Sequence, residues 1–410
     1  MPRVVITGMG ALTPIGNDVH EFQAGLAASK VGFNPISHFD ASETGITLAG
    51  ELTDFEPLTR LGKKDLRRMD TFSQYAVYAT AEAIEQAGIT EENTEAEQLG
   101  VIYGSGIGGL TTIQEQVTKM NEKGPQRVSP MFVPTAISNM ASGNIAIRYH
   151  AKNICTTIVT ACASGTNAIG EAFRQIKEGR AQVMITGGSE ASINEIGIAG
   201  FAALSTLSTA TDPTKASLPF DANRLGFVMG EGAGTLILES LEHAQARGAE
   251  ILGEVVGYGA TSDAYHMTSP DPAGTQAARA MQLAIDEADV TPAQVGYVNA
   301  HGTATMGNDS AESAAINQVF GQDSDVLVSS TKSMTGHLLG AAGAIEAVAT
   351  ISALQAGQLP VNVGLTEQDP NCDVNLVNDD NRNTAVDYAI SNSFGFGGHN
   401  AVLAFRKWAD

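Results

Sequence analysis

Short β-branched runs alternate with helix-forming segments along the chain, and this alternation constrains the fold more than any other feature. The pattern predicts strands at 3–10, 100–106, 157–161, 182–188, 233–239, 295–302, 325–330 and 400–406. It predicts helices at 70–88, 164–178, 241–247, 274–287, 309–320 and 340–356. Interleaved strands and helices form layered α/β folds. A chain of 410 residues is long enough for two domains or two fused halves.

The two parts of the chain repeat one local arrangement. Strand 157–161 leads through a bend of small residues into a Gly/Ala-rich helix, and strand 325–330 leads into a similar segment before helix 340–356. Such units recur in many α/β proteins, but here they favour two similar halves around a shared core. We place these halves at 1–250 and 251–410, and we expect chemistry where strand ends and helix starts from both halves converge.

Charge and cysteine content narrow the function class. The formal net charge of −22 argues against general nucleic-acid binding and against docking on anionic membranes. By inspection, no apolar run reaches the roughly 18–20 residues that a membrane helix needs. Three cysteines without framework spacing do not suggest disulfides, so we expect a reducing cytoplasm.

The segment VIYGSGIGGL contains the pattern G-x-G-x-x-G at Gly104, Gly106 and Gly109. This pattern is typical of dinucleotide-binding turns, which also need a following helix and a second strand that ends in an acid. The region after it, MNEKGPQRVSP, does not have the composition of a strand. We therefore expect a structural glycine turn rather than a nucleotide site.

Cys162 stands in TACASGTNAIG, between a predicted strand and a predicted helix. A lone cysteine is most often an inert core residue. Here the small residues that follow allow a tight turn, and a helix N-terminus favours the thiolate and lowers the thiol pKa. We expect Cys162 to be a nucleophile, and Cys155 and Cys372, which lack this setting, to be unreactive.

Two of the eight histidines, His301 and His337, also stand among small residues at strand-to-bend junctions. A Cys–His hydrolase needs one base, oriented by an Asn or Asp. Two neutral imidazoles could instead donate N–H bonds to a developing enolate oxygen, which stabilises a carbanion. Lys332 is expected to pair with Glu312, the alternative being a solvated loop lysine.

The segment NSFGFGGHN (392–400) has three glycines and two phenylalanines, which is not typical of an ordinary strand. It predicts either a plain glycine hairpin or a loop that points a backbone N–H at an oxyanion while an aromatic ring gates a cavity. Periodicity does not choose between these alternatives.

Seven segments of the chain carry a family resemblance: RVVITGMGALTPIGN, TACASG, MGEGAG, TSDAYHMTSP, NAHGTAT, STKSMTGHLLGAAGAIEA and SNSFGFGGHNA. Together they resemble the β-ketoacyl-[acyl-carrier-protein] synthases, and most of all the type II elongating enzymes of bacterial fatty acid synthesis. The resemblance runs from Arg3 to about Phe405. It implies a thiolase-like α/β fold, with two similar α/β/α/β/α halves that form a five-layered core. It also implies a homodimer and a decarboxylative Claisen condensation of a cysteine-bound acyl group with malonyl-ACP, where ACP is the acyl-carrier protein.

The resemblance carries roles onto matching positions. The implied catalytic set is Cys162 (nucleophile), His301 and His337 (decarboxylation and enolate binding), Lys332 with Glu312, and Phe396 (gate, and oxyanion N–H together with that of Cys162). The implied substrate-binding set is Ile107 and Phe132 (acyl pocket), Ser269, Thr303 and Thr305 (phosphopantetheine arm), and Phe394. A structural monovalent cation is implied at Asn299, Glu346, Ser391 and Asn392. No cofactor is implied for catalysis, because phosphopantetheine arrives on ACP.

The sequence departs from the family pattern after NAHGTAT, where MGNDSAES lacks the usual proline-containing loop, and at His399, where some members have threonine. The departure after NAHGTAT leaves loop detail open, but not the assignment of His301.

The partners implied are acyl-ACP and malonyl-ACP. Carrier proteins are acidic, so docking on a chain of charge −22 needs a local basic patch. The segment RLGKKDLRR supplies one, at Arg60, Lys63, Lys64, Arg67 and Arg68. A charge run is otherwise usually a solvated face.

Four rival interpretations remain open at this point: a polyketide condensing enzyme, a type I synthase, a catalytically silent partner subunit and a nucleotide-binding dehydrogenase. The silent subunit is disfavoured because Cys162, His301 and His337 are all present.

Overall fold

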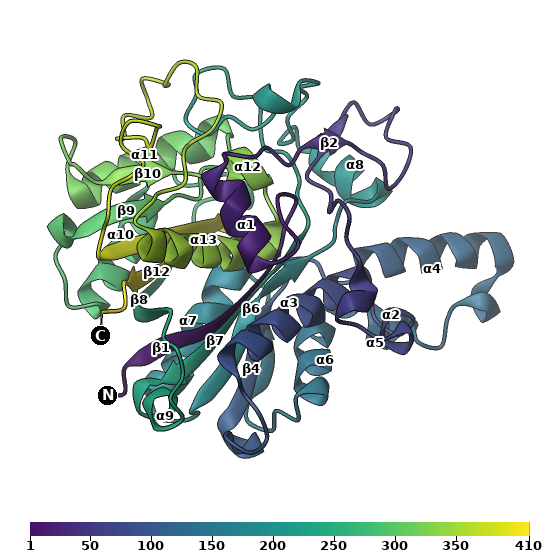
Figure 1. Ribbon diagram of the computed structural model, residues 1–410. Coiled ribbons are helices and arrows are strands. Elements are labelled where there is room, and N and C mark those ends of the chain that lie inside the picture. Colours follow the sequence, from purple (N-terminus) through teal and green to yellow (C-terminus); the bar gives the residue numbers. More distant parts are fainter. Residues whose placement is uncertain (410) are drawn as a thin grey trace.

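The computed structural model describes residues 1–409, and one sheet of ten strands runs through it in the order β10-β9-β11-β12-β8-β1-β7-β6-β4-β5 (Figure 1). The first half of the chain supplies β1 (Val4–Leu12), β4 (Leu99–Gly104), β5 (Cys155–Ile158), β6 (Val183–Glu190) and β7 (Gly232–Ser240). The second half supplies β8 (Gly253–Ser262), β9 (Val295–Asn299), β10 (Leu327–Ser329), β11 (Tyr388–Gly395) and β12 (His399–Arg406). A further two-stranded sheet pairs β2 (Asn34–Pro35) with β3 (Leu48–Ala49).

The pairing pattern repeats between the halves. β1, β7 and β6 pair antiparallel in turn, and β6, β4 and β5 pair parallel. In the second half β8, β12 and β11 pair antiparallel, although the β12–β11 pair is a hairpin, and β11, β9 and β10 pair parallel. The two five-stranded units meet where β1 pairs with β8. This symmetry is the two-half organisation that the repeated local pattern predicted.

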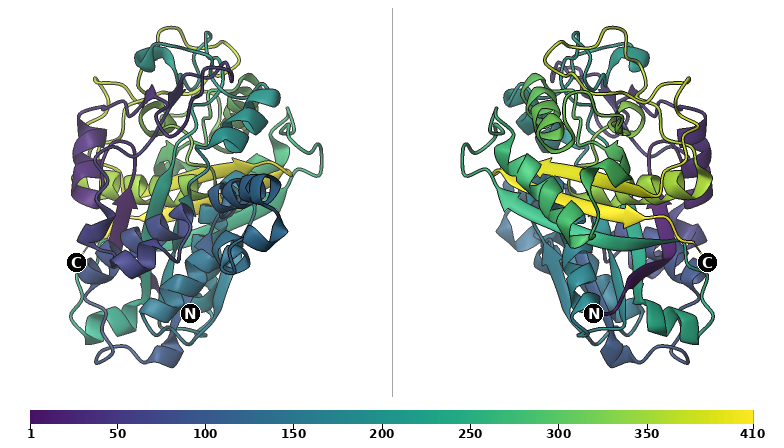
Figure 2. Two further views of the ribbon diagram at one scale, coloured as in Figure 1. Left: turned by 90° about the vertical axis from the view of Figure 1, so that its right-hand side faces the viewer. Right: turned by 90° about the vertical axis from the view of Figure 1, so that its left-hand side faces the viewer.

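Helices form the other layers (Figure 2). α3 (Thr71–Ala87) covers β1 and β7, and α10 (Thr275–Glu287) covers β8 and β12. Between the two five-stranded units of the sheet, α7 (Ser164–Lys177) and α13 (Ala342–Ala356) pack on each other and on strands of both halves. α6 (Met140–Arg148) packs on β4 and β5, while α11 (Met306–Phe320) packs on α10. The result is the predicted α/β arrangement of five layers.

The central position of α13 explains its composition. Thirteen of its residues, from Ala342 to Leu354, are buried. One 18-residue stretch, Leu339–Ala356, is long and apolar enough to cross a membrane, but 89% of it is buried inside the protein. The expectation that no stretch reaches that length was therefore wrong, because a core helix covered by both five-stranded units is apolar on all sides.

Several elements lie outside the predicted pattern. β8 was not predicted because glycines interrupt its apolar residues, and Gly257 and Gly259 leave room for the backbone of α10. α1 (Val19–Ala27), α4 (Leu110–Lys123), α5 (Phe132–Ala136) and α8 (Glu195–Ala203) were also missed. α6 and the short helices α2 (Lys63–Leu66) and α12 (Lys332–Thr335) were missed too, whereas α9 (Leu241–Ala246) is the helix predicted at 241–247.

Candidate active site

Cys162 lies in a tight turn between β5 and α7. β5 ends at Ile158, Ala161 adopts a positive φ of 51°, and α7 begins at Ser164. The Ser164 hydroxyl donates to the carbonyl of Ala161 (2.6 Å) and accepts from the N–H of Thr160 (2.9 Å). The turn places the thiol at the start of a helix, with 8% of the residue exposed.

His301 and His337 come from the second half of the chain and meet Cys162 at one cavity of about 680 Å³ that all three line. His301 follows β9, and His337 lies between α12 and α13. Their ring centroids are 5.2 Å apart, and the ring planes are nearly perpendicular at 85°. The structure therefore brings together the three residues that the sequence singled out from distant segments.

Both imidazoles are neutral at pH 7. Burial, reinforced by the positive charge of Lys332, lowers the pKa of His301 and of His337 well below the usual value. The N–H of Leu339 donates to Nδ1 of His337 (3.3 Å), so the proton of this ring is on Nε2. Neutral rings that carry an N–H can donate hydrogen bonds into the cavity, as the sequence pattern suggested.

The thiol of Cys162 differs from the prediction. Burial raises its pKa to about 12, and the charge of Lys332 and nearby N–H groups offset this only in part. The expectation of a lowered thiol pKa was wrong for the free chain, because desolvation outweighs the helix terminus. Burial also raises the pKa of Cys155 and of Cys372, so geometry rather than pKa distinguishes Cys162.

Lys332 does not pair with Glu312, as was expected, but with Glu346 on α13, and both side chains are almost fully buried. Glu312 instead accepts the backbone N–H groups of His301 (2.8 Å) and Gly302 (2.7 Å). It also accepts from the Asn392 amide (3.0 Å). Glu312 is committed to these donors, so it holds the backbone of His301, while the nearby α13 supplies the counter-ion of Lys332.

The glycine-rich segment 392–400 is a hairpin between β11 and β12, and a hairpin is compatible with both alternatives. Gly397 and Gly398 take positive φ angles of 89° and 75° at its turn. A Cβ on Gly395 would lie 2.7 Å from the carbonyl oxygen of Thr160, so only glycine allows this close approach. The turn brings the N–H of Phe396 to the Cys162 sulfur, and the Phe396 ring stacks on Phe201 at 6.2 Å.

Four of the predicted substrate-binding residues, Ser269, Thr303, Thr305 and Phe394, line the same cavity. Ile107 and Phe132 do not line it. Ile107 packs on an apolar cluster that includes Cys162. Phe132 is half-buried on α5.

The sequence reasoning missed Glu190, at the end of β6. This buried carboxylate accepts the N–H groups of Gly106 (2.7 Å), Ile107 (3.2 Å) and Gly340 (3.0 Å), and burial raises its pKa to about 7. An internal carboxylate thus occupies the glycine turn that a nucleotide phosphate would need. A helix, α4, does follow the turn, but no strand of the described chain lies between it and β5. A glutamate directly after the strand and glycines of QVMITGGSE was the available signal.

Several non-glycine residues in left-handed conformation flank the cavity-lining segments, among them Ala161, Ala304 and Leu339, with φ of 51°, 63° and 48°. They stand one residue before Cys162, beside Thr303 and Thr305, and two residues after His337. Such conformations cost about 1–3 kcal/mol each and persist only where the surroundings fix them. Their concentration here indicates a site held in one geometry.

Four buried oxygen atoms lie unpaired beside the catalytic residues: Oδ1 of Asn299, Oε2 of Glu346, Oγ of Ser391 and Oδ1 of Asn392 find no hydrogen-bond partner within residues 1–409. Asn299 on β9 and Ser391 on β11 are direct register partners. A buried, unpaired acceptor is costly, so these oxygens fit a small hard cation. The described chain holds no group of three His, Cys, Asp or Glu side chains suited to a metal ion.

The basic segment lies on and beside α2. Lys63, Lys64, Arg67 and Arg68 are exposed. Arg60 differs from them, because it pairs with Glu82 (3.3 Å) and its guanidinium lies 4.5 Å from the Tyr78 ring centroid. Arg60 is therefore half-buried against α3 and does not belong to the exposed patch.

Comparison with known proteins agrees with this site. The family models described as Beta-ketoacyl synthase, N-terminal domain, and Beta-ketoacyl synthase, C-terminal domain, match residues 1–244 and 252–366. The chain is 49% identical over 408 residues to a 3-oxoacyl-[acyl-carrier-protein] synthase 2 of Synechocystis sp., which covers 99% of this chain and 98% of that protein.

Two solved structures are also similar over the whole chain. One is the ishigamide ketosynthase/chain length factor, with a TM-score of 0.94, 36% identity and full coverage of both chains. The other is a type II polyketide ketosynthase, AntDE, in complex with its acyl-carrier protein AntF, with a TM-score of 0.92, 31% identity and coverage of 99% and 100%. The chain therefore belongs to the β-ketoacyl synthase family and is a condensing enzyme of the acyltransferase class.

Proposed function

We propose that this protein is a 3-oxoacyl-[acyl-carrier-protein] synthase 2, which elongates a cysteine-bound acyl group by two carbons from malonyl-ACP. The observation that carries the proposal is the meeting of Cys162, His301 and His337 at one cavity. The identity of 49% to a 3-oxoacyl-[acyl-carrier-protein] synthase 2, against 36% to the ishigamide ketosynthase/chain length factor and 31% to the type II polyketide ketosynthase, favours fatty acid elongation.

In the first half-reaction the Cys162 sulfur attacks the acyl thioester carbonyl. The thiol proton leaves during the attack and ends on the departing pantetheine sulfur, so the products are the Cys162 thioester and a free pantetheine thiol. The backbone N–H of Phe396, which points at the sulfur, and that of Cys162 would stabilise the oxyanion of the tetrahedral intermediate.

In the second half-reaction malonyl-ACP loses CO₂, and the electron pair of the broken bond forms an enolate. The neutral rings of His301 and His337 donate N–H bonds to its oxygen. Its carbon then attacks the thioester, and Cys162 leaves as a thiolate. Because burial raises the pKa of this thiol to about 12, the thiolate takes up one proton per turnover. The side chains and backbone N–H groups suffice for these steps, so we propose that no cofactor is required.

The direct test is incubation with acyl-ACP and malonyl-ACP, followed by mass analysis of the carrier protein. We expect 3-oxoacyl-ACP and CO₂ in equal amounts, no product with Cys162→Ala, and greatly reduced CO₂ release with His301→Ala. Acylation retained at another cysteine in Cys162→Ala would contradict the assignment. Repeated extension without reduction of the keto group would indicate a polyketide synthase instead.

We propose a homodimer built on the face around α4. None of the residues of α4 is buried, and Ile113, Val117 and Met120 are exposed at the i, i+4, i+7 spacing of one helix face. Figure 1 shows α4 projecting from the body of the molecule. Light scattering should give twice the chain mass, and Val117→Asp should give a monomer. A monomeric wild-type chain would refute this part.

A second copy on this face would also explain why Phe132, which was expected in the acyl pocket, does not line the cavity of the single chain. α4 packs on α5, which carries Phe132, and Gly109 beside Ile107 donates its N–H to the carbonyl of Ala136 on α5 (3.0 Å). We propose that the acyl pocket extends from Cys162 past Ile107 toward this face and is closed there by the dimer. Loss of long-chain but not short-chain substrates in Val117→Asp is the expected sign.

We propose two further features of the enzyme. Lys63, Lys64, Arg67 and Arg68 dock the acidic carrier protein. The unpaired oxygens of Asn299, Glu346, Ser391 and Asn392 hold a monovalent cation of structural role. Potassium or sodium chloride should raise the melting temperature above that in tetramethylammonium chloride, and Asn392→Ala should remove the difference. Equal melting temperatures for the wild type in all three salts would refute the cation.

A further inference from the structure

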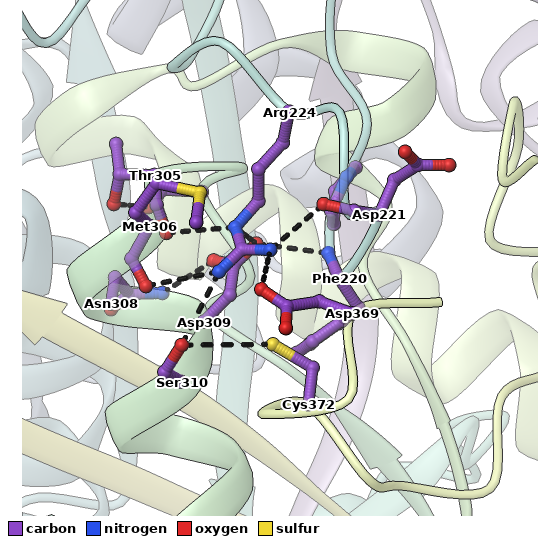
Figure 3. Close-up of polar contacts among 12 residues, drawn as sticks. Phe220, Asp221, Arg224, Thr305, Met306, Asn308, Asp309, Ser310, Asp369 and Cys372 are labelled. Atoms are coloured by element: carbon purple, nitrogen blue, oxygen red, sulfur yellow. Dashed lines mark hydrogen bonds and ion pairs between the residues drawn. The ribbon is translucent and has the colours of Figure 1, made fainter. Parts of the chain in front are cut away.

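Arg224 is a fully buried guanidinium that the catalytic set does not use. It lies between β6 and β7 in the chain, and its side chain is 0% exposed. Figure 3 shows it at the centre of a polar cluster formed by three separate segments. Its ion-pair partners are Asp369 (Nη1 to Oδ2, 2.7 Å) and Asp309 (Nε to Oδ2, 3.5 Å). Two carboxylates close to one buried cation explain why the charge is tolerated there.

Nη1 of Arg224 also donates to the carbonyl of Asp221 (2.8 Å), and the other donors go to a wall of the reaction cavity. Nε donates to the carbonyl of Thr305 (3.3 Å), and Nη2 donates to the carbonyl of Met306 (3.0 Å) and the hydroxyl of Ser310 (3.3 Å). All three of these residues line the cavity. The planar fork of one side chain thus fixes the backbone at the start of α11, where the sequence had left the loop conformation open.

The same segment connects Arg224 to His337. The N–H of Gly226 donates to the carbonyl of Ala304 (3.0 Å), which stands between Thr303 and Thr305. Phe227 follows, and its ring packs edge-on against the His337 ring, with centroids 5.2 Å apart. The N–H of His337 then donates to the carbonyl of Val228 (2.7 Å). The five residues 224–228 therefore run from the buried cluster to a catalytic histidine.

The third segment of the cluster anchors this arrangement to the rest of the protein. Asp221 accepts the backbone N–H groups of Thr366 (2.6 Å) and Glu367 (3.1 Å), and the N–H of Asp369 donates to the carbonyl of Phe220 (2.9 Å). Residues 220–224 are thereby held on the 366–369 loop, and Asp309 of α11 also accepts the N–H of Phe220 (2.9 Å), so the cluster ties three segments together.

We propose that Arg224 is a positioning residue that sets the spacing between the Thr303–Ser310 wall and His337, and so the seat of the pantetheine thioester during condensation. This inference rests on the proposed function. Arg224 touches no reacting atom. It acts through the carbonyls of Thr305 and Met306 on one side and through Gly226 and Phe227 on the other.

The test compares Arg224→Lys and Arg224→Met with a matched pair at Arg247. Arg247 is also buried, at 11% exposed, and binds Glu239 through Nε and Nη2, but neither residue lines the cavity. Three quantities are measured for each variant: KM and kcat for malonyl-pantetheine with the acylated enzyme, the rate of Cys162 alkylation by iodoacetamide, and the melting temperature.

Lysine keeps the charge near Asp369 but lacks the fork that reaches the two carbonyls and Ser310. We therefore expect Arg224→Lys to raise KM about tenfold, with kcat changed less than about threefold and alkylation unchanged. Both Arg247 variants should melt lower than the wild type and keep its KM. Arg224→Met should show at least the KM effect of the lysine variant if it folds.

A wild-type KM in Arg224→Lys would overturn the inference. So would an equal rise of KM in Arg247→Lys, or a parallel loss of alkylation in Arg224→Lys, because either result would show a general structural role. These outcomes presuppose an active wild type. A wild-type enzyme that forms no 3-oxoacyl product would refute the proposed function, and this inference with it.

Discussion

Replacing Lys332 with methionine should destabilise the fold by about 3 kcal/mol at pH 7 and by almost nothing near pH 4.5. Lys332 and Glu346 are 1% and 2% exposed and form an ion pair. Methionine leaves the Glu346 carboxylate without a counter-ion in the protein interior. Burial already raises the pKa of Glu346, and without the ammonium it rises further. The carboxyl of the variant will therefore be protonated in the folded state at pH 7.

The magnitude follows from this protonation. Keeping a carboxyl with an ordinary pKa of 4.5 protonated at pH 7 costs about 3 kcal/mol, at 1.36 kcal/mol per pKa unit. In Lys332→Met the pKa of Glu346 is higher in the folded than in the unfolded state, so the loss of stability is fully present above the folded-state pKa. It disappears as pH falls to the unfolded pKa. The pH dependence distinguishes this cause from loss of packing.

The double variant Lys332→Met with Glu346→Gln is the control. It removes both charges, so urea denaturation at pH 7 should recover most of the stability lost in the single variant. Activity should not recover, because the charge of Lys332 helps to keep His301 and His337 neutral and lowers the pKa of Cys162. Alkylation of Cys162 should therefore shift to higher pH in both variants.

Denaturation is best measured in tetramethylammonium chloride, so that no small cation replaces the ammonium beside Glu346. A penalty in Lys332→Met that does not change between pH 4.5 and 7 would refute the electrostatic reasoning. A double variant as unstable as the single one would refute it as well.

Three further predictions follow from the site. Arg67→Glu with Arg68→Glu should raise KM for malonyl-ACP but not acyl transfer from a small thioester; equal losses with both donors would contradict the docking patch. Gly395→Ala should slow acylation at least tenfold, about 1.4 kcal/mol, because its Cβ would lie 2.7 Å from the Thr160 carbonyl oxygen. Gly200→Ala, whose Cβ would meet open space, is the control and should have no effect; equal acylation rates in the two variants would contradict this reasoning. Burial raises the pKa of Glu312 from 4.5 to about 7, so this residue should lower the stability of the wild type by about 3 kcal/mol as pH rises from 4.5 to 7. In Glu312→Gln the melting temperature should therefore fall less steeply with pH over this range, and an unchanged slope would contradict the shift.

The sequence predicted the elements that repeat and the residues that stand where they end. Strand-to-bend junctions marked Cys162, His301 and His337 because small residues and glycines punctuate the chain there. The pairing of Lys332 was not predictable, since Glu312 and Glu346 stand 20 and 14 residues from it and only the packing of α13 decides between them. The thiol pKa was mispredicted for a similar reason, because the helix terminus is visible in the sequence and the burial is not.

Residues that act through the backbone left the weakest signals. Glu190, Glu312 and Arg224 each bind main-chain groups of other segments at or near the site, and their partners are fixed by the fold rather than by neighbouring residues. β8 and α4 were missed because glycines interrupt the first and the second has a polar composition with an exposed apolar face. The exposed apolar face of α4 is the face on which we propose that a second copy of the chain packs.

The charge state of the resting site explains why its residues are arranged as they are. The thiol is protonated, because its pKa is about 12, and both imidazoles are neutral. The ammonium of Lys332 is matched by Glu346 within the core. Negative charge therefore appears at the cavity only during reaction, first on the thioester oxygen and then on the enolate. A donor that must reorient to meet such charge loses part of its effect, whereas a fixed donor does not. The strained residues Ala161 and Leu339, the carboxylates of Glu190 and Glu312 and the fork of Arg224 all hold the donors in place before the charge arrives, which makes rigidity of the cavity walls a requirement of the chemistry.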